Sequence, residues 1–74
     1  MKNLYELEEN LISRITKLDS SYDSKLGLAE MGVMPGVAIR MIKKTPFGGP
    51  DEVKINNYYL TLRKEDAILI YLNN

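Results

Sequence analysis

The 74-residue sequence contains no cysteine and no histidine. Without cysteine, the chain can form neither a disulfide framework nor a thiolate metal site. Without histidine, it lacks the usual general base at neutral pH and the usual imidazole ligand for zinc or copper. Serine-type triads, cysteine proteases and zinc hydrolases are therefore excluded, and we expect a protein that is not an enzyme.

The sequence also lacks a net charge, because ten basic and ten acidic residues cancel and are interleaved along the chain. Nucleic-acid binding normally requires a basic excess on one face, and binding to a membrane surface requires basic clusters. The longest apolar runs, such as residues 68–72, are far shorter than the roughly twenty residues that span a bilayer. Residues 1–9 have no apolar signal region. We therefore expect a cytoplasmic protein with no nucleic-acid partner and no direct membrane insertion.

Hydrophobic residues make up 45% of the sequence, enough for one small core, and we expect a single domain over residues 1–74. Five short segments have the composition or alternation of β-strands: 11–18, 37–44, 53–55, 58–63 and 68–72. Alternation places Val37, Ile39 and Met41 on the inner side of the second segment. In the last segment it places Ile68, Ile70 and Leu72 on the inner side.

Two connections between these segments have recognisable signals. Asn56–Asn57 suits a two-residue hairpin turn, because asparagine tolerates positive φ better than other non-glycine residues. Residues 20–32 predict a short helix, with a capping-box pattern at its start and Leu28 and Met31 facing the core. Gly32 is placed to end that helix in the left-handed conformation.

These elements predict a mainly β fold, a small SH3-like five-stranded β-barrel with one short helix between strands 1 and 2. Five strands in a chain of this length leave two edges to protect, and curling the sheet into a barrel hides them. An OB-type barrel is the alternative, but it needs longer strands and a longer chain.

Two pairs of adjacent acids are carboxylate candidates for a metal site: Asp51 with Glu52, and Glu65 with Asp66. Carboxylates suit hard cations such as Fe(II) or Ca²⁺. Neighbours in sequence tend to point apart, so we expect solvated charged turns, with a weak Fe(II) site as the alternative. No cofactor is expected.

Phe47 is the only phenylalanine, and it lies between Pro46 and Pro50 in a glycine-containing loop. An aromatic side chain on a stiff loop is either a docking anchor or a cap that folds back over the barrel mouth. Other partner-binding candidates are predicted to be exposed: Met34 before a Pro-Gly turn, Tyr59 and Arg63 on the outward side of segment 58–63, and Lys64 directly after it. For the strand residues, a solvated sheet face without a partner is the alternative. Four further basic residues are candidates for a mildly positive side opposite the acidic amino terminus: Arg40, Lys43, Lys44 and Lys54.

Three motifs resemble one family. Residues 28–36, Leu-Ala-Glu-Met-Gly-Val-Met-Pro-Gly, resemble its Leu-x-x-Leu/Met-Gly-hydrophobic-x-Pro-Gly element. Residues 44–50 are similar to its basic-x-Pro-Phe/Leu-Gly-x-Pro loop, and residues 58–67 are similar to its closing Leu-Ser/Thr-Leu-Arg-basic-acid-acid-Ala run. Together they resemble FeoA, the small cytosolic partner of the FeoB ferrous iron transporter, over residues 25–72. Gly49 and Asn57 depart from the family pattern, and residues 7–10 stand where many relatives have a Leu-x-Pro-Gly turn.

The resemblance implies an SH3-like barrel that is a non-enzymatic accessory of Fe(II) uptake and docks on the cytosolic GTPase region of a FeoB-type transporter. Two other functions stay open. One is a weak carboxylate-based Fe(II) sensor. The other is a self-associating module that forms a homo-oligomer through its edge strands or through Leu69 and Tyr71.

Overall fold

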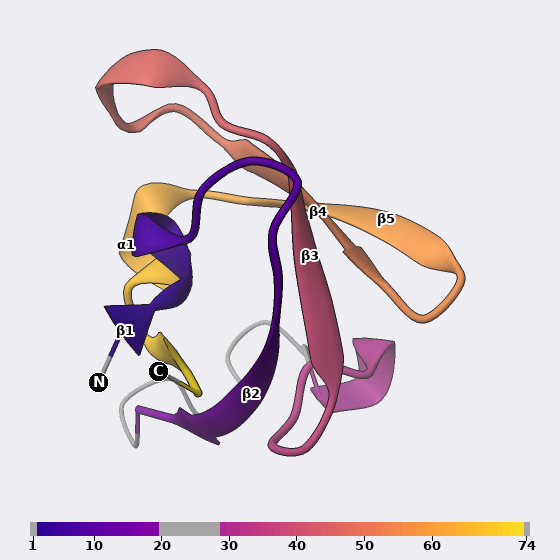
Figure 1. Cartoon of the computed structure of the whole chain (residues 1–74). Coiled ribbons are helices and arrows are strands. Elements are labelled where there is room, and N and C mark those ends of the chain that lie inside the picture. Colours follow the sequence, from indigo (N-terminus) through magenta and orange to yellow (C-terminus); the bar gives the residue numbers. More distant parts are fainter. Residues whose placement is uncertain (1, 20–28, 74) are drawn as a thin grey trace.

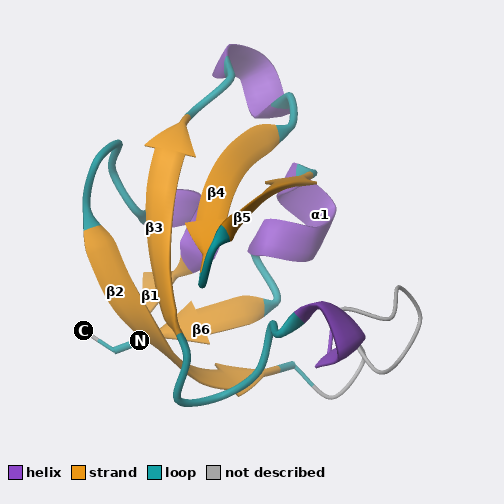
Figure 2. Ribbon diagram, turned by 90° about the vertical axis from the view of Figure 1, so that its right-hand side faces the viewer, coloured by secondary structure: helices purple, strands orange, loops and turns teal. Residues whose placement is uncertain are grey.

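The computed structural model describes residues 2–19 and 29–73, which form one antiparallel sheet (Figure 1). The strand order is β1-β6-β2-β3-β4-β5. The strands are β1 (Lys2–Asn3), β2 (Ile12–Leu18), β3 (Ala38–Lys43), β4 (Asp51–Ile55), β5 (Tyr58–Leu62) and β6 (Ile70–Leu72). Helix α1 (Lys64–Ala67) joins β5 to β6, and 3₁₀ turns cover Leu4–Glu6, Ala29–Met31 and Pro46–Gly48. Figure 2 shows the sheet strongly curved, with the two ends of the chain on the same side.

The local sequence explains the strand boundaries. Asn56 has a φ of 54° in the turn that pairs Ile55 with Tyr58, so the predicted Asn-Asn hairpin is confirmed. Gly32 has a φ of 93° just after the turn Ala29–Met31, also as predicted. The alternation along β2 is imperfect because its pairing with β6 shifts register between Ile15 and Lys17, which is typical of a β-bulge.

Among the residues that the structure describes, the core consists of twelve buried apolar side chains supplied by both ends and the middle of the chain. The predicted inward positions Ile39, Met41, Ile70 and Leu72 are all fully buried. These side chains are Leu4, Leu7, Ile15, Val33, Ile39, Met41, Val53, Ile55, Leu62, Ala67, Ile70 and Leu72.

The amino-terminal segment joins the core through a strand that the sequence analysis missed. Asn3 and Glu6 form a reciprocal capping box, in which each side chain accepts the other residue's backbone N–H. This turn follows β1, which pairs with β6, and it buries Leu4. Within residues 2–19 and 29–73, the sheet therefore has six strands rather than five.

The prediction of core positions is wrong for two residues. Ile68 is 37% exposed because α1 occupies residues 64–67, buries Ala67 instead, and delays the last strand until Ile70. Met31 is 38% exposed at the end of a 3₁₀ turn. Residues 20–28 of the predicted helix lie outside the described residues. No helix in the described parts of the chain is long and apolar enough to cross a membrane.

Candidate docking surfaces

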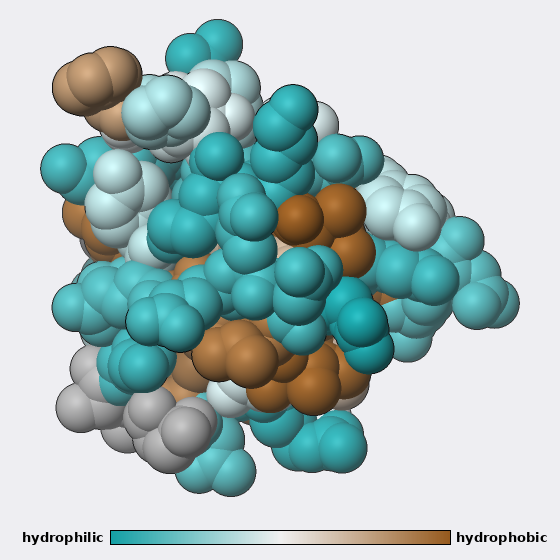
Figure 3. All heavy atoms as spheres, turned by 45° about the horizontal axis from the view of Figure 1, so that its top comes forward, coloured by the Kyte–Doolittle hydropathy of each residue, from teal (hydrophilic) through white to brown (hydrophobic). Residues whose placement is uncertain are grey.

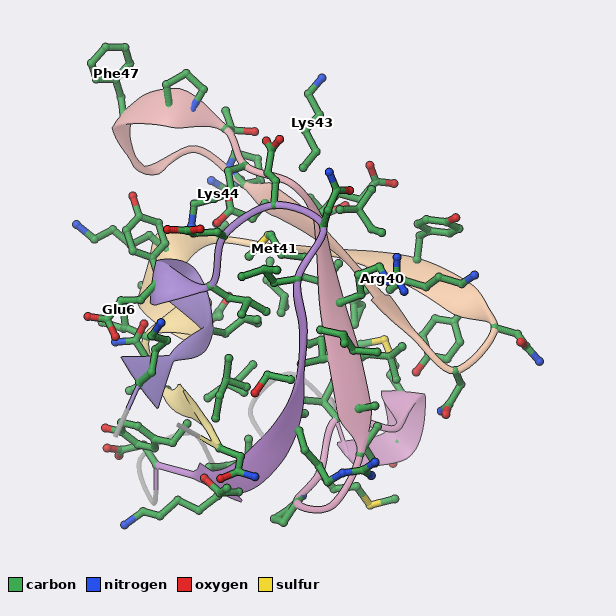
Figure 4. The ribbon with its side chains drawn as sticks, viewed as in Figure 1. Glu6, Arg40, Met41, Lys43, Lys44 and Phe47 are labelled. Atoms are coloured by element: carbon green, nitrogen blue, oxygen red, sulfur yellow. The ribbon has the colours of Figure 1, made fainter. Side chains whose placement is uncertain are left out.

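Phe47 lies at the tip of the turn Pro46–Gly48, where the chain leaves β3 and returns to β4. Its side chain is 104% exposed, and Figure 4 shows it pointing away from the body of the molecule. Of the two interpretations of this residue, the cap over the barrel mouth is therefore wrong. An exposed aromatic side chain remains available for docking.

The backbone at Phe47 is in the left-handed region, with φ 61° and ψ 36°. A bulky residue other than glycine rarely occupies this region, and such residues cost of order 1–3 kcal/mol and cluster at functional sites. Pro46 fixes the preceding φ, and Gly48 also has a positive φ of 75°. The turn is thus held in a strained shape that presents Phe47 to solvent.

Asp51 and Gly49 hold the base of this turn. The Thr45 backbone N–H donates to Asp51 Oδ1 at 2.9 Å, and Asp51 is 1% exposed. A Cβ at Gly49 would lie 2.5 Å from Thr45 Cγ2, a separation that real Cβ atoms do not show. Only glycine therefore fits there without a shift of Thr45.

The metal candidates are not brought together. Asp51 is buried rather than part of a solvated charged turn, so that expectation is wrong for this residue. Glu52 is half-buried next to it on β4, where consecutive side chains point to opposite faces. Glu65 is exposed and Asp66 half-buried on α1. Within residues 2–19 and 29–73, no three His, Cys, Asp or Glu side chains lie close enough to hold a metal ion.

Lys64 lies beside the Phe47 turn. A Cβ at Gly48 would be 3.6 Å from Lys64 Cδ, so the lysine stem runs next to the turn. The Lys64 ammonium is 5.2 Å from the centroid of the Tyr5 ring, and the Lys44 ammonium is 5.0 Å from the same centroid. Two cations therefore share one aromatic ring beneath the loop, a favourable arrangement for each cation.

Lys44 is bound to the amino-terminal segment. Its ammonium donates to the backbone carbonyl oxygens of Tyr5 and, at 3.1 Å, of Leu7, and its backbone N–H donates to Glu9 at 2.8 Å. The expectation that Lys44 faces away from the acidic amino terminus is wrong. No local sequence signal predicts these hydrogen bonds, because the partners of Lys44 lie 35 to 39 residues before it in the sequence.

The remaining partner-binding candidates are exposed but separated. Met34 is 46% exposed in the turn before β3, whereas Phe47 follows β3, so the two lie at opposite ends of that strand. Tyr59 is 56% exposed near the β4–β5 turn, on the opposite side of Figure 1 from the Phe47 turn. Arg63 is exposed directly before α1 and next to Lys64. Only Lys64, with Arg63 beside it, adjoins the Phe47 turn.

Exposed apolar side chains are scattered over this surface. Figure 3 shows brown apolar patches among teal hydrophilic side chains on the face turned forward. The large exposed apolar residues of the described chain are Leu11, Ile12, Met31, Met34, Phe47, Tyr59 and Ile68. Phe47 is the most exposed of them, which makes its loop the leading docking candidate.

Comparison with protein families gives a match to the FeoA domain over residues 2–74. The chain belongs to the FeoA domain family. This result confirms the resemblance that the three sequence motifs indicated. A comparison with curated proteins gives no match.

Solved structures resemble this FeoA domain along nearly its whole length. Iron(II) transport protein A from Clostridium thermocellum is 35% identical, with a TM-score of 0.85 over 96% of this chain. The FeoA domain spans only 44% of that protein's length. An FeoA-like protein from Clostridium acetobutylicum is 25% identical, with a TM-score of 0.82, and the match covers 99% of this chain and 87% of that one.

A third relative establishes the fold class. Stenotrophomonas maltophilia FeoA, solved in complex with zinc and described as a procaryotic SH3 domain protein, has a TM-score of 0.84 at 22% identity. The match covers 99% of this FeoA domain and 91% of that protein. The predicted mainly β, SH3-like fold is therefore confirmed.

Proposed function

We propose that this FeoA domain is a non-enzymatic accessory of ferrous iron uptake that docks on the cytosolic GTPase region of a FeoB-type transporter. Family membership supports the link to iron transport. The Stenotrophomonas relative is described as possibly acting as a ferrous iron transport activating factor, and the Clostridium thermocellum relative as an iron(II) transport protein. A role at a transporter would require a cytoplasmic protein.

The observation that carries the docking proposal is Phe47, a fully exposed aromatic side chain on a strained turn. Aromatic side chains dominate binding energy at interfaces, and a rigid loop loses little conformational entropy on binding. Lys64 beside this turn, and Arg63 next to Lys64 in the sequence, would supply charge at the rim of the interface. We place the contact at these three residues.

A binding measurement tests the proposal directly. The full chain is titrated onto a FeoB-type transporter in lipid nanodiscs, and its affinity is compared with that of Phe47→Ala. Loss of a central aromatic anchor commonly costs 2 kcal/mol or more, so we expect affinity to fall about 30-fold. Leu11→Ala is the matched control, since Leu11 is an exposed apolar residue outside the Phe47 turn. Equal affinities for the wild type and Phe47→Ala would contradict the proposal.

A further inference from the structure

Four side chains lie in one row across four neighbouring strands: Ile12, Arg40, Lys54 and Tyr59. Ile12 on β2 pairs with Arg40 on β3, Arg40 pairs with Lys54 on β4, and Lys54 pairs with Tyr59 on β5. Directly paired residues point to the same face of a sheet. The neighbours of the two central residues along β3 and β4 are fully buried, namely Ile39, Met41, Val53 and Ile55, and Ile12 and Tyr59 are themselves exposed. This row, which we name the basic row, therefore faces outward.

The basic row borders a hollow in the surface. A pocket of about 290 Å³ is lined by Ile12, Ala38, Arg40, Lys54 and Asn56. Ile12 is 58% exposed and Tyr59 is 56% exposed, although both are large apolar or aromatic residues. The row thus has an exposed apolar group at each end and two cations at its centre.

The two central cations have no ion-pair partner in the described chain, and the nearest acid along β4 on the same face is Glu52, two residues from Lys54. No carboxylate of residues 2–19 and 29–73 forms an ion pair with Arg40 or Lys54. The Lys54 ammonium lies 5.6 Å from the centroid of the Tyr59 ring, which places a cation over an aromatic face but supplies no anion. Like charges directly opposed on neighbouring strands are destabilising. An anion bound between them would remove this repulsion.

We propose that the basic row binds an acidic segment of a partner protein, with one carboxylate flanked by two apolar side chains. The carboxylate would meet Arg40, whose guanidinium can donate two parallel hydrogen bonds, and the Lys54 ammonium. The flanking apolar side chains would contact Ile12 and Tyr59. This surface goes beyond the transporter contact at Phe47, and neither depends on the other.

Spacing favours an extended segment. Neighbouring strands lie about 4.8 Å apart, so three steps separate Ile12 from Tyr59 by roughly 14 Å. In an extended peptide, side chains on one face repeat every two residues, so positions i and i+4 are about 13 Å apart. A Leu-x-Glu-x-Leu sequence therefore matches the order and span of the row. Since the whole chain has a formal net charge of zero, the positive charge here is local, which favours a short acidic segment over nucleic acid.

A peptide titration followed by NMR tests the proposal. The probe is acetyl-Ser-Leu-Ser-Glu-Ser-Leu-Ser-amide added to the ¹⁵N-labelled full chain, and the matched probe has glutamine in place of glutamate. We expect the amide signals of Ile12, Arg40, Lys54 and Tyr59 to shift with the glutamate peptide. The loss of one solvent-accessible charge pair is worth about fivefold in affinity, and the glutamine peptide loses the pairs with both Arg40 and Lys54, so it should bind more than about fivefold more weakly.

Variants separate this surface from other basic residues. Arg40→Gln and Lys54→Gln should each weaken the glutamate peptide about fivefold without lowering the unfolding temperature, because each removes one of two opposed charges. Lys43→Gln removes the same charge from β3 outside the basic row, and it should change binding less than twofold. Phe47→Ala should also change peptide binding less than twofold.

Several outcomes would overturn the proposal. They are equal binding of the two peptides, no shifts at millimolar peptide, or shifts confined to other residues. Inorganic phosphate binding at Arg40 and Lys54 as tightly as the peptide would indicate a general anion site instead. Sedimentation that shows a dimer of the chain, lost in Arg40→Gln, would assign the surface to a second copy.

Discussion

The Lys44 ammonium donates to the backbone carbonyl oxygen of Tyr5 and lies 5.0 Å from the centroid of the same residue's ring. One lysine at the end of β3 thereby fixes the amino-terminal turn that buries Leu4. Lys64 approaches the same ring from α1. The Tyr5 ring and its two lysines thus join the amino-terminal turn, the end of β3 and α1 at the base of the Phe47 loop.

Replacing Lys44 by methionine should destabilise the fold. The change removes charge-assisted hydrogen bonds to the carbonyl oxygens of Tyr5 and Leu7, and such bonds contribute roughly 1.5–3 kcal/mol each when well formed. Because Lys44 is only half-buried, we expect a total loss of about 1–2 kcal/mol in the free energy of unfolding, measured with urea. Lys43→Met, at the exposed last residue of β3 directly before Lys44, should change stability by less than about 0.5 kcal/mol. Equal effects of the two variants would argue against a structural role for Lys44.

Replacing Phe47 by glycine should stabilise the fold slightly. Glycine occupies the left-handed region without the steric cost that Phe47 bears there, although it has more entropy to lose on folding. The net gain should be below about 1 kcal/mol, whereas Phe47→Ala, which keeps the strain and loses no contact, should leave stability nearly unchanged. Calorimetric unfolding temperatures provide the measurement. A large loss of stability in either variant would mean that Phe47 packs against the body of the protein.

Adding a methyl group at Gly49 should distort the loop. A Cβ there meets Thr45 Cγ2 at 2.5 Å, and overpacking of this kind costs about 1–3 kcal/mol. Thr45→Ser removes that methyl group and keeps the backbone N–H that donates to Asp51. We therefore expect Gly49→Ala to lower the unfolding temperature and the double variant with Thr45→Ser to recover part of the loss. No recovery would show that another contact limits the site.

Asp51 should act as a structural acceptor. Asp51→Ala leaves the Thr45 N–H without its partner and should cost about 1–3 kcal/mol. Asp51→Asn keeps an acceptor oxygen, and the second carboxylate oxygen of Asp51 has no hydrogen-bond partner in the described chain. The asparagine variant should therefore be clearly more stable than the alanine variant in urea unfolding. Similar losses would assign the stability to the negative charge instead.

Calorimetry addresses the carboxylate alternative. The four candidate carboxylates are divided between β4, with Asp51 and Glu52, and α1, with Glu65 and Asp66. Among the described residues, no three His, Cys, Asp or Glu side chains lie close enough together to hold a metal ion. We expect anaerobic Fe(II) titration to give no binding heat at submillimolar metal. Saturable heat that disappears in Glu65→Gln would instead favour a metal sensor.

Local signals in the sequence predict much of this fold. The Asn56 turn, the left-handed Gly32 and the buried Ile39 and Met41 each follow from a residue and its immediate neighbours. The prediction that Ile68 faces the core is wrong, because a run of alternating apolar residues does not reveal that a short helix precedes it. The six strands include a two-residue β1 whose pairing depends on contact with the other end of the chain.

The candidate site was predictable only in part. Phe47 stands out as the single phenylalanine between two prolines, but the sequence left its direction open. Two arrangements depend on the register of strands that are distant in sequence. One is the contact of Lys44 and Lys64 with the Tyr5 ring, and the other is the basic row. Strand register across long connections is set by tertiary packing, which a single sequence does not display.

Iron uptake in cells is the most direct test of the docking account. Cells that express a FeoB-type transporter with the wild-type chain, Phe47→Ala or Leu11→Ala are supplied with radiolabelled Fe(II), and the purified variants are compared by thermal unfolding. The account predicts that Phe47→Ala lowers uptake to the level of cells without the chain, while its unfolding temperature and the uptake of Leu11→Ala stay unchanged. Normal uptake with a folded Phe47→Ala chain would contradict it.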